Sequence, residues 1–231
     1  AIYDTGIGYP DGYNMGDVVI IPFLRQQHIY HLDKLIISHG DADHAGGAAA
    51  VLQQFPQLPI LTSAIDKFKQ YQVQSCHAGQ RWWWDGVEFD MLYPFPQQKQ
   101  TDNNSSCVLQ IHAGNQSVLL PGDIEKPAEY ALASQYAAQL KSTLLLAPHH
   151  GSNSSSTGRF LAAVQPQYVI FATGYLNRYR FPSKQVVARY QQHNSQCVNS
   201  AFEGAITVIL QPLKPIEIHR YRAEFHHFWN G

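Results

Sequence analysis

The segment His39-Gly40-Asp41-Ala42-Asp43-His44 follows the short apolar run Leu35-Ile36-Ile37, with Ser38 between them. Its two histidines and two aspartates are side chains that bind metals, and they lie at the carboxyl end of a predicted strand, where α/β sheets place their binding sites. On a regular strand or helix these side chains would diverge, so a bound metal is the simplest reason for the pattern. The alternative is a polar turn with a histidine at each end.

Two later segments repeat this arrangement. Leu119-Leu120-Pro121-Gly122-Asp123 ends an apolar strand with a glycine and a carboxylate, and Leu144-Leu145-Leu146-Ala147-Pro148-His149-His150-Gly151 ends another with paired histidines. Each pattern alone is common in proteins. Because three predicted strands end in metal-binding residue types, the sequence favours a metal site over three unrelated turns.

Apolar runs alternate with helical patterns along most of the chain, which predicts α/β layers. We expect one domain, with a hairpin and a long surface loop in residues 72–103. Strands are expected at 107–112, 117–120, 143–147, 168–172, 205–210 and, as an edge strand, 216–222, and helices at 126–140, 158–164 and 183–192.

Composition excludes several classes of protein. The 231 residues contain 16 Lys+Arg and 17 Asp+Glu, and the 45% hydrophobic content with a net charge of −1 argues against disorder and against a globally basic nucleic-acid protein. No run of 18 apolar residues is present, so no membrane span is expected. Cys76, Cys107 and Cys197 form no Cys-x-x-Cys pair; one disulfide is possible, and its partners and the redox compartment stay open.

The motif His39-x-Asp41-x-Asp43-His44-x-Gly46-Gly47 resembles the first motif of the metallo-β-lactamase fold. Leu119–Asp123 and Pro148–Ser152 are similar to later motifs of that fold. The combination resembles the C-terminal domain of the ComEC (Rec2) family of competence proteins, which form the inner-membrane channel for incoming DNA. Further matches to that family are Asp4-Thr5-Gly6, Asn104–Leu109, Gly174–Asn177, Phe181-Pro182 and Glu203–Ile206.

The resemblance implies a metallo-β-lactamase αβ/βα four-layer sandwich that occupies residues 1–231 as a single domain. The family opens with a strand before Asp-Thr-Gly, and this chain begins after it. We therefore expect a segment of a longer membrane protein that lacks the first strand. Phe181 stands where many relatives have histidine, so no catalytic role is assigned to it.

The family's layout implies two divalent metal ions. The first would take His39, Asp41 and Asp123, and the second Asp43, His44, Asp123 and His150, with Asp123 bridging. His149 would face a substrate phosphate or orient a ligand, so Asp43, Asp123 and His149 are the expected catalytic residues. Asp41 replaces the histidine usual in the wider fold. Its hard oxygen donor favours Mn²⁺ or Mg²⁺ relative to Zn²⁺, which still tolerates mixed ligands.

The implied function is a metal-dependent DNase that degrades the strand not imported during natural transformation. Its partners would be DNA, expected to be single-stranded, and the membrane channel of the same polypeptide, with the isolated domain a monomer at the periplasmic face. Contacts to substrate phosphate are expected from Ser152 and Asn153, because they lie in a donor-rich loop directly after the paired histidines, although a flexible serine-rich turn is the alternative. Further contacts are expected from Asn177, Arg178 and Arg180, because residues 177–190 are cationic, aromatic and free of acids; a solvated helix with its entry loop is the alternative there. The alternatives are a non-catalytic DNA-guiding domain and a small phosphodiesterase or phosphorylcholine esterase.

Asp41 generates the first prediction. Phosphodiesterase activity is expected to be higher with Mn²⁺ than with Zn²⁺, and Asp41→His, which replaces an oxygen donor by nitrogen, is expected to raise the Zn²⁺-to-Mn²⁺ activity ratio about tenfold. Initial rates of both proteins, loaded with each metal in turn, measure this ratio. The same ratio in wild type and variant would show that Asp41 does not set the metal preference.

Overall fold

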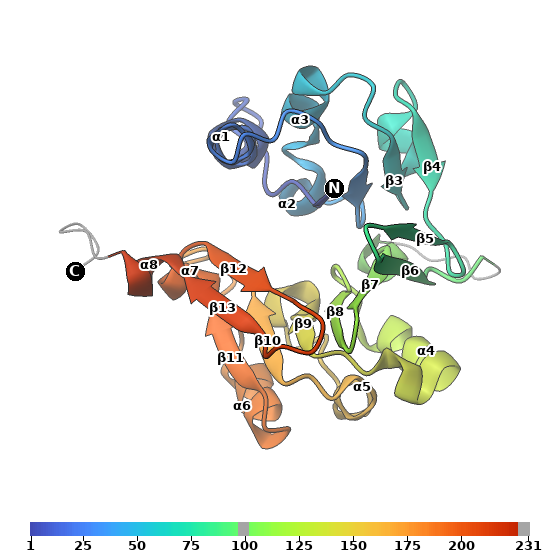
Figure 1. The fold of residues 1–231 in the computed structure, drawn as a ribbon, viewed down its shortest axis with the longest axis vertical. Coiled ribbons are helices and arrows are strands. Elements are labelled where there is room, and N and C mark those ends of the chain that lie inside the picture. Colours follow the sequence, from blue (N-terminus) through green and yellow to red (C-terminus); the bar gives the residue numbers. More distant parts are fainter. Residues whose placement is uncertain (97–101, 226–231) are drawn as a thin grey trace. The chain divides into compact units, whose positions relative to one another are not determined.

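The computed structural model describes residues 1–96 and 102–225 of the chain. Its contacts group into two compact units: unit 1 is Ala1–Gln80 with Met91–Val108, and unit 2 is Arg81–Asp90 with Leu109–Gly231. Each unit contains its own sheet and helices (Figure 1). The single-domain count stays a prediction.

Unit 1 is built on a four-stranded sheet in which every neighbouring pair is parallel. The strands, in spatial order, are β1 (Ile2–Tyr3), β2 (Leu35–Ile37), β3 (Ile60–Thr62) and β4 (Val73–Ser75). The central strands β2 and β3 are buried at every position, as expected for parallel strands covered on both faces. The short apolar run that precedes His39 is therefore confirmed as a strand.

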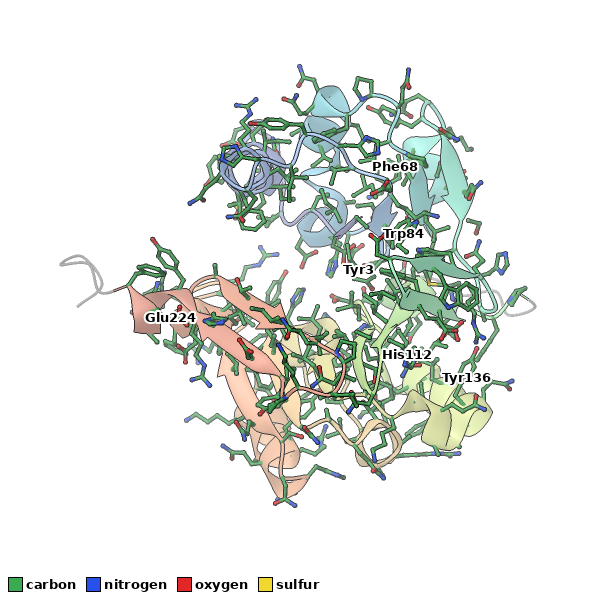
Figure 2. All side chains as sticks on the ribbon, viewed as in Figure 1. Tyr3, Phe68, Trp84, His112, Tyr136 and Glu224 are labelled. Carbon is green, nitrogen blue, oxygen red and sulfur yellow. A yellow bond between two sulfur atoms is a disulfide. The ribbon has the colours of Figure 1, made fainter. Side chains whose placement is uncertain are left out.

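Short helical segments complete unit 1. They are the π-helix η1 (Gly16–Ile20), α1 (Ile21–Gln26), α2 (Ala42–Ala45), α3 (Ala48–Gln54) and the 3₁₀-helices η2 (Ile65–Phe68) and η3 (Asp102–Ser105). The apolar faces of α1 and α3 pack with β2 and β3 in one cluster that includes Leu24, Val51 and Ile60. Phe68, labelled in Figure 2, belongs to the same core.

Two glycines behind the ligand motif allow the N-terminal segment to lie against it. A Cβ on Gly46 would stand 2.0 Å from the backbone N of Gly8, and a Cβ on Gly47 would stand 2.4 Å from the carbonyl oxygen of Thr5. Only glycine permits such a close backbone approach. The Gly46-Gly47 pair is therefore needed to bring residues 4–8 beside the segment 39–44.

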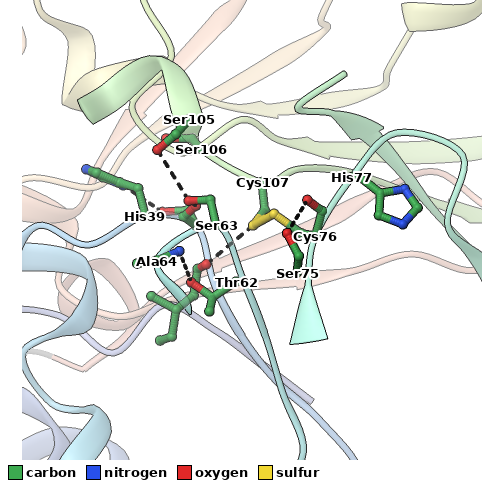
Figure 3. The surroundings of a disulfide bond; sticks show 12 residues. His39, Thr62, Ser63, Ala64, Ser75, Cys76, His77, Ser105, Ser106 and Cys107 are labelled. Atoms are coloured by element: carbon green, nitrogen blue, oxygen red, sulfur yellow. Dashed lines mark hydrogen bonds between the residues drawn. A yellow bond between two sulfur atoms is a disulfide. The ribbon is translucent and has the colours of Figure 1, made fainter. Parts of the chain in front are cut away.

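Unit 1 also contains the disulfide that the sequence left open. Cys76, just after β4, is bonded to Cys107, and both are at most 1% exposed (Figure 3). The backbone N–H of Cys107 donates to the carbonyl of Ser38 at 2.8 Å, next to His39. Cys197 is the free cysteine. Because the bond closes a span of 31 residues, it restricts the unfolded chain as well as the folded one.

The seven-stranded sheet, most of whose residues belong to unit 2, has the order β11-β10-β9-β8-β7-β6-β5. Pairs β8–β9, β9–β10 and β10–β11 are parallel, while β5–β6 and β7–β8 are antiparallel hairpins. The strands are β5 (Arg81–Trp84), β6 (Val87–Tyr93), β7 (Val108–Ala113), β8 (Gln116–Leu120), β9 (Leu144–Leu146), β10 (Tyr168–Phe171) and β11 (Gln196–Asn199). The parallel part brings the ends of β8 and β9 to one edge.

Helices connect β8 to β9, β9 to β10 and β10 to β11, and two short helices, α7 and α8, follow β11 and β13 (Glu217–Arg220), respectively (Figure 1). Thr157 and Ser183 begin α5 and α6 by accepting a backbone N–H with the side-chain oxygen, as N-cap residues do. The helices are α4 (Lys126–Tyr136), the 3₁₀-helices η4 (Ala137–Leu140) and η5 (Pro148–Gly151), α5 (Gly158–Val164), α6 (Lys184–Gln192), α7 (Ser200–Glu203) and α8 (Tyr221–Glu224).

The predicted elements in 107–210 and the hairpin in 72–103 are confirmed within a residue or two, except that α4 gives way to η4 before residue 140. The edge strand expected at 216–222 is confirmed as the shorter β13 (Glu217–Arg220), whose residues alternate in exposure. It pairs with β12 (Ile206–Ile209) in a separate two-stranded sheet, and the chain then turns into α8. The alternation of that tail indicated a strand but not its neighbour. Part of the expected long loop, residues 97–101, lies outside the described residues.

None of the helices in residues 1–96 and 102–225 combines the length and the apolar character that crossing a bilayer requires.

The second prediction concerns the disulfide. Replacing both Cys76 and Cys107 by serine is expected to lower the free energy of unfolding by about 3–4 kcal/mol, because the unfolded chain regains the entropy of an open loop. Urea unfolding followed by circular dichroism measures the change. Cys197→Ser is the matched control and should differ from wild type by less than about 0.5 kcal/mol. Equal stability of the double variant and wild type would contradict a stabilising bond.

Candidate metal-binding site

In unit 1, the carboxylate of Asp4 organises the histidines of the first motif. Its Oδ2 lies 2.7 Å from Nδ1 of His44 and accepts the hydroxyl of Ser38 at 2.9 Å, while Oδ1 accepts the backbone N–H of Ser38 at 2.7 Å. A carboxylate only accepts, so Nδ1 of His44 carries the proton and Nε2 carries the lone pair. Asp4 has a left-handed backbone (φ 60°), a conformation that aspartate tolerates better than most residues.

His39 is oriented by the same group of atoms. Oγ of Ser38 lies 3.0 Å from Nδ1 of His39, and its own proton is donated to Asp4. The serine oxygen therefore accepts from His39, which again places the lone pair on Nε2. The carbonyl of Ser38 accepts the hydroxyl of Ser63 at 2.9 Å, near the disulfide (Figure 3). Both imidazoles are almost fully buried.

The two aspartates of the motif lie at the start of α2. Asp41 is its N-cap residue, and Asp43 lies in the first turn, where a negative charge is favourable. Oδ2 of Asp41 is 3.5 Å from Nε2 of His39. Thr5 secures this loop, because its N–H and hydroxyl both donate to the carbonyl of His44, at 2.7 and 2.8 Å. The motif therefore brings His39, Asp41 and His44 to one end of β2.

In unit 2, His149 and His150 have an unusual backbone. Both are left-handed, with φ of 47° and 54°, which costs roughly 1–3 kcal/mol per residue and is concentrated at functional sites. Nδ1 of His150 donates to the carbonyl of Ala172 at 2.8 Å, so Nε2 of this ring also carries the lone pair. Nδ1 of His149 lies 3.2 Å from the hydroxyl of Ser154.

Asp123 lies beside these two rings. It follows β8 through Gly122, whose φ of 59° turns the chain, and its side chain is buried. Its Oδ2 is 3.6 Å from Nε2 of His150 and 3.8 Å from Nε2 of His149. Because β8 and β9 are parallel neighbours, their carboxyl ends lie at the same edge of the sheet. The structure therefore brings together Asp123, His149 and His150, as the strand ends predict.

The serine-rich loop that follows is fixed by buried Glu129 of α4. The carboxylate of Glu129 accepts the backbone N–H groups of Ser156 and Thr157, and Arg189 of α6 donates to the carbonyls of Ser155 and Ser156. Burial raises the pKa of Glu129, while these N–H groups oppose the shift. Ser155 and Ser156 are fully buried, so this half of the loop supports the histidines from within the protein.

The residues predicted to bind substrate lie in two loops of unit 2. Ser152 bonds to Ser154 at 3.0 Å, and Oδ1 of Asn153 accepts from Ser183 at 2.5 Å. The side-chain amide of Asn177 donates to the carbonyls of Gly174 and Phe181 and accepts the N–H of Phe181, so it holds its own loop together. Arg178 and Arg180 are exposed. Contact of these residues with a substrate stays a prediction.

The donor set fits a divalent metal. His39, His44 and His150 each have Nδ1 engaged by an oxygen, which is the arrangement found behind metal-binding imidazoles: it fixes the tautomer and directs Nε2 outward. Carboxylates accompany the rings in both units. Imidazole with carboxylate suits Zn²⁺ and Mn²⁺, and a larger carboxylate share favours the harder ion.

Comparison with known proteins agrees with this chemistry. The model of the metallo-beta-lactamase superfamily matches residues 1–175, which include both histidine motifs and Asp123. The chain belongs to the metallo-beta-lactamase superfamily. Members of this superfamily are typically metal-dependent hydrolases.

Curated relatives narrow the placement within the superfamily. The chain is 38% identical to competence protein ComA of Neisseria gonorrhoeae over 81% of its own length and 26% of the relative. It is 34% identical to recombination protein 2 of Haemophilus influenzae over 97% of its length and 28% of the relative. These homologues belong to the ComEC/Rec2 family, so the resemblance read from the motifs is confirmed. The chain spans about a quarter of the length of these relatives.

Solved structures agree on the fold. Tm1679, a metal-dependent hydrolase of the beta-lactamase superfamily, matches with a TM-score of 0.52 and 12% identity over 85% of this chain and 84% of that one. At this identity the likeness establishes the metallo-beta-lactamase fold and no specific activity.

Sequence reasoning missed the roles of Asp4 and Ser38. The Asp4-Thr5-Gly6 motif matches the family, but its link to His44, forty residues away, is visible only in three dimensions. Glu129 was missed for the same reason. An acidic residue on the buried face of a helix was the available signal, because such a residue requires hydrogen-bond partners.

Asp4 generates the third prediction. Asp4→Asn keeps the size of the side chain but removes the charge that holds Nδ1–H of His44, so we expect metal affinity to fall about 10–100-fold. Isothermal titration with Mn²⁺ measures the affinity, and urea unfolding checks that the fold persists. Asp11→Asn, which changes an exposed aspartate of the same segment, should bind metal as wild type does. Unchanged affinity in Asp4→Asn would remove Asp4 from the site.

Proposed function

We propose that the chain is a metal-dependent phosphodiesterase that cleaves DNA, as one domain of a ComEC-like DNA-uptake channel. The observation that carries this proposal is the set of three histidines whose Nδ1 atoms are each held by an oxygen, two in unit 1 and one in unit 2. Membership of a superfamily of metal-dependent hydrolases and homology to competence proteins support it.

The proposed centre draws ligands from both motif groups. His39, Asp41 and Asp123 would hold one ion, and Asp43, His44, Asp123 and His150 the other. That these side chains converge on one centre is part of the proposal. Mn²⁺ is the expected ion because of the carboxylate share, with Zn²⁺ or Mg²⁺ as alternatives. When bound, two such ions supply Lewis acidity, which activates a water molecule and neutralises a phosphodiester.

Side chains of the protein would position the ions and orient the phosphodiester. The buried carboxylate of Asp123 lies beside both histidines, so it would fix their positions relative to the ions. His149 has its Nδ1 beside Ser154 and its ring at the edge of the donor-rich loop, which suits contact with a phosphate oxygen. Ser152 and Asn153 would add hydrogen bonds to that phosphate. A bound phosphodiester would in this way be oriented for in-line attack.

DNA is the proposed substrate because cations accompany these groups. The cationic guanidinium groups of Arg178 and Arg180, in the loop after β10, are exposed. Guanidinium groups bind phosphate. Tyr179 lies between the two arginines in the sequence and Phe181 follows them, so their rings would be available to stack on bases. The relatives named for competence and recombination support the same class of substrate. Degradation of the strand that is not imported follows from the proposed uptake context.

The disulfide supports a location outside the cytoplasm. Stable protein disulfides form in oxidising compartments and are rare in the cytosol. We therefore place the domain at the extracytoplasmic face of the inner membrane, attached to the channel portion of the same polypeptide and monomeric when isolated.

The fourth prediction tests the activity. The Mn²⁺-loaded protein is expected to cleave labelled DNA, and Asp43→Ala should lower the rate by about a hundredfold or more, because losing one ligand forfeits several kcal/mol of transition-state stabilisation. Asp43→Ala should leave DNA affinity nearly unchanged, since affinity depends on cation–phosphate contacts. Asp66→Ala, an exposed aspartate of unit 1, is the matched control and should cleave as wild type does.

Arg178 and Arg180 provide a test that separates DNA binding from DNA cleavage. Joint replacement of Arg178 and Arg180 by alanine should weaken DNA binding and reduce the salt dependence of the affinity by about one unit of slope for each phosphate that the variant no longer neutralises. Cleavage at saturating DNA should persist. DNA binding without cleavage in Mn²⁺, Mg²⁺ and Zn²⁺ would support a non-catalytic guiding domain instead, and hydrolysis of phosphorylcholine esters alone would support a small-molecule esterase.

A further inference from the structure

Unit 2 contains a cavity of about 740 Å³ that the metal chemistry does not use. It is lined by the loop 174–182 together with residues from β10, α6, β11 and α7. All of them belong to residues 171–202, and the fold arranges these consecutive elements around one space. The volume lies within the roughly 300–1,000 Å³ typical of small-ligand sites.

Aromatic rings contribute to the cavity lining. Phe181 is one of the lining residues, and Tyr179 is stacked on it at 5.5 Å between ring centroids and 20° between planes. Phe202 of α7 lies in the same lining and is 66% exposed; its ring is nearly perpendicular to that of Tyr175, with 6.3 Å between the ring centroids. An aromatic ring so exposed has little role in the core. Rings presented in this way stack nucleic-acid bases.

The charge of the cavity is positive. Arg178 and Arg180 are part of the lining, and no lining residue is acidic. Within residues 1–96 and 102–225, neither guanidinium forms a salt bridge with a carboxylate. The guanidinium of Arg178 instead lies 4.5 Å from the centroid of the Tyr179 ring. A ligand with both a flat apolar part and a negative charge matches this lining.

A polar group on β11 adds a directed donor. Oδ1 of Asn199 accepts the hydroxyl of Thr173 at 2.7 Å and the N–H of Ala201 at 2.9 Å. Asn199 belongs to the cavity lining, and its Nδ2 is the donor that this side chain can offer to a ligand. An N–H donor pairs with the carbonyl oxygens and ring nitrogens that every DNA base carries at its edge.

We propose that this cavity receives one unpaired base of the DNA chain, stacked beside Phe202, while a neighbouring phosphate binds Arg178 and Arg180. Phe181 connects the cavity to the chemistry, since its ring lies 5.8 Å from the ring of His149. A base inside a duplex is stacked and paired, so it enters such a cavity only when it is flipped out or already single-stranded. The proposal rests on the proposed function for its substrate and adds a reason for single-strand selectivity.

Cys197 supplies a reporter that needs no metal and no activity. It lines the cavity, and it is the free cysteine because the other two are bonded. Burial raises the pKa of its thiol, so alkylation by N-ethylmaleimide is followed at one fixed alkaline pH. The reaction is run with the full chain in EDTA, with a short oligothymidylate, the matching abasic oligonucleotide or a blunt duplex of equal length.

The fifth prediction is the pattern of protection. The oligothymidylate should slow alkylation roughly tenfold at saturation, and the abasic chain and the duplex should give little protection, because neither offers a base to stack. With Phe202→Ala, the oligothymidylate concentration that gives half-maximal protection should rise roughly tenfold. Leu213→Ala, which changes a residue that is 90% exposed and outside the lining, should behave as wild type.

The outcomes distinguish the cavity from the nuclease. Equal protection by the abasic chain, or no protection at concentrations where anisotropy shows oligothymidylate bound, would overturn the base site. If protection depends on the base but no metal gives cleavage, the base site stands and the proposed nuclease fails. If DNA is cleaved while Phe202→Ala leaves KM for single strands unchanged, the nuclease stands and the base site fails.

Discussion

The carboxylate of Asp4 is the group on which the arrangement of unit 1 depends most. It joins the end of β1 to Ser38 and His44 by hydrogen bonds of 2.7 to 2.9 Å, and through Ser38 it also orients His39. Charge-assisted bonds of this kind are stronger than neutral ones. One side chain therefore sets the tautomers of two imidazoles and ties the N-terminal segment to the loop after β2.

That link is possible only because backbone atoms approach closely behind it. Gly46 and Gly47 leave room for residues 5 and 8, and Thr5 then donates twice to the carbonyl of His44. In unit 2 the histidines are positioned by a strained backbone instead. His149 and His150 are both left-handed, and the serine loop that follows them is held by hydrogen bonds to Glu129. In each unit, residues that orient the histidines lie outside the ligand motif itself.

The cavity beside Phe181 is also formed by residues outside the ligand motifs. Its aromatic and cationic lining comes from residues 171–202, that is, from the end of β10 onward, whereas His149 and His150 follow the earlier strand β9. Phe181 contacts the ring of His149 and also lines the cavity, so it stands between the two groups. Phe181 thus has a packing role in this chain, which suits the proposed recognition of a base by stacking.

Much of the fold was readable from the sequence because it depends on local pattern. Apolar runs and helical periodicity located the strands and helices from residue 107 to residue 210, and ligand types at three strand ends located both halves of the candidate site. The family motifs added the fold. Tertiary structure alone decided which cysteines pair, that Asp4 holds His44, that Glu129 supports the serine loop, and that β13 pairs with β12. It also brought Cys197, Asn199 and Phe202 to the loop at 174–182. The physical reason is that periodicity records which face of an element is buried, whereas hydrogen bonds, disulfides and cavities depend on which distant segment covers that face.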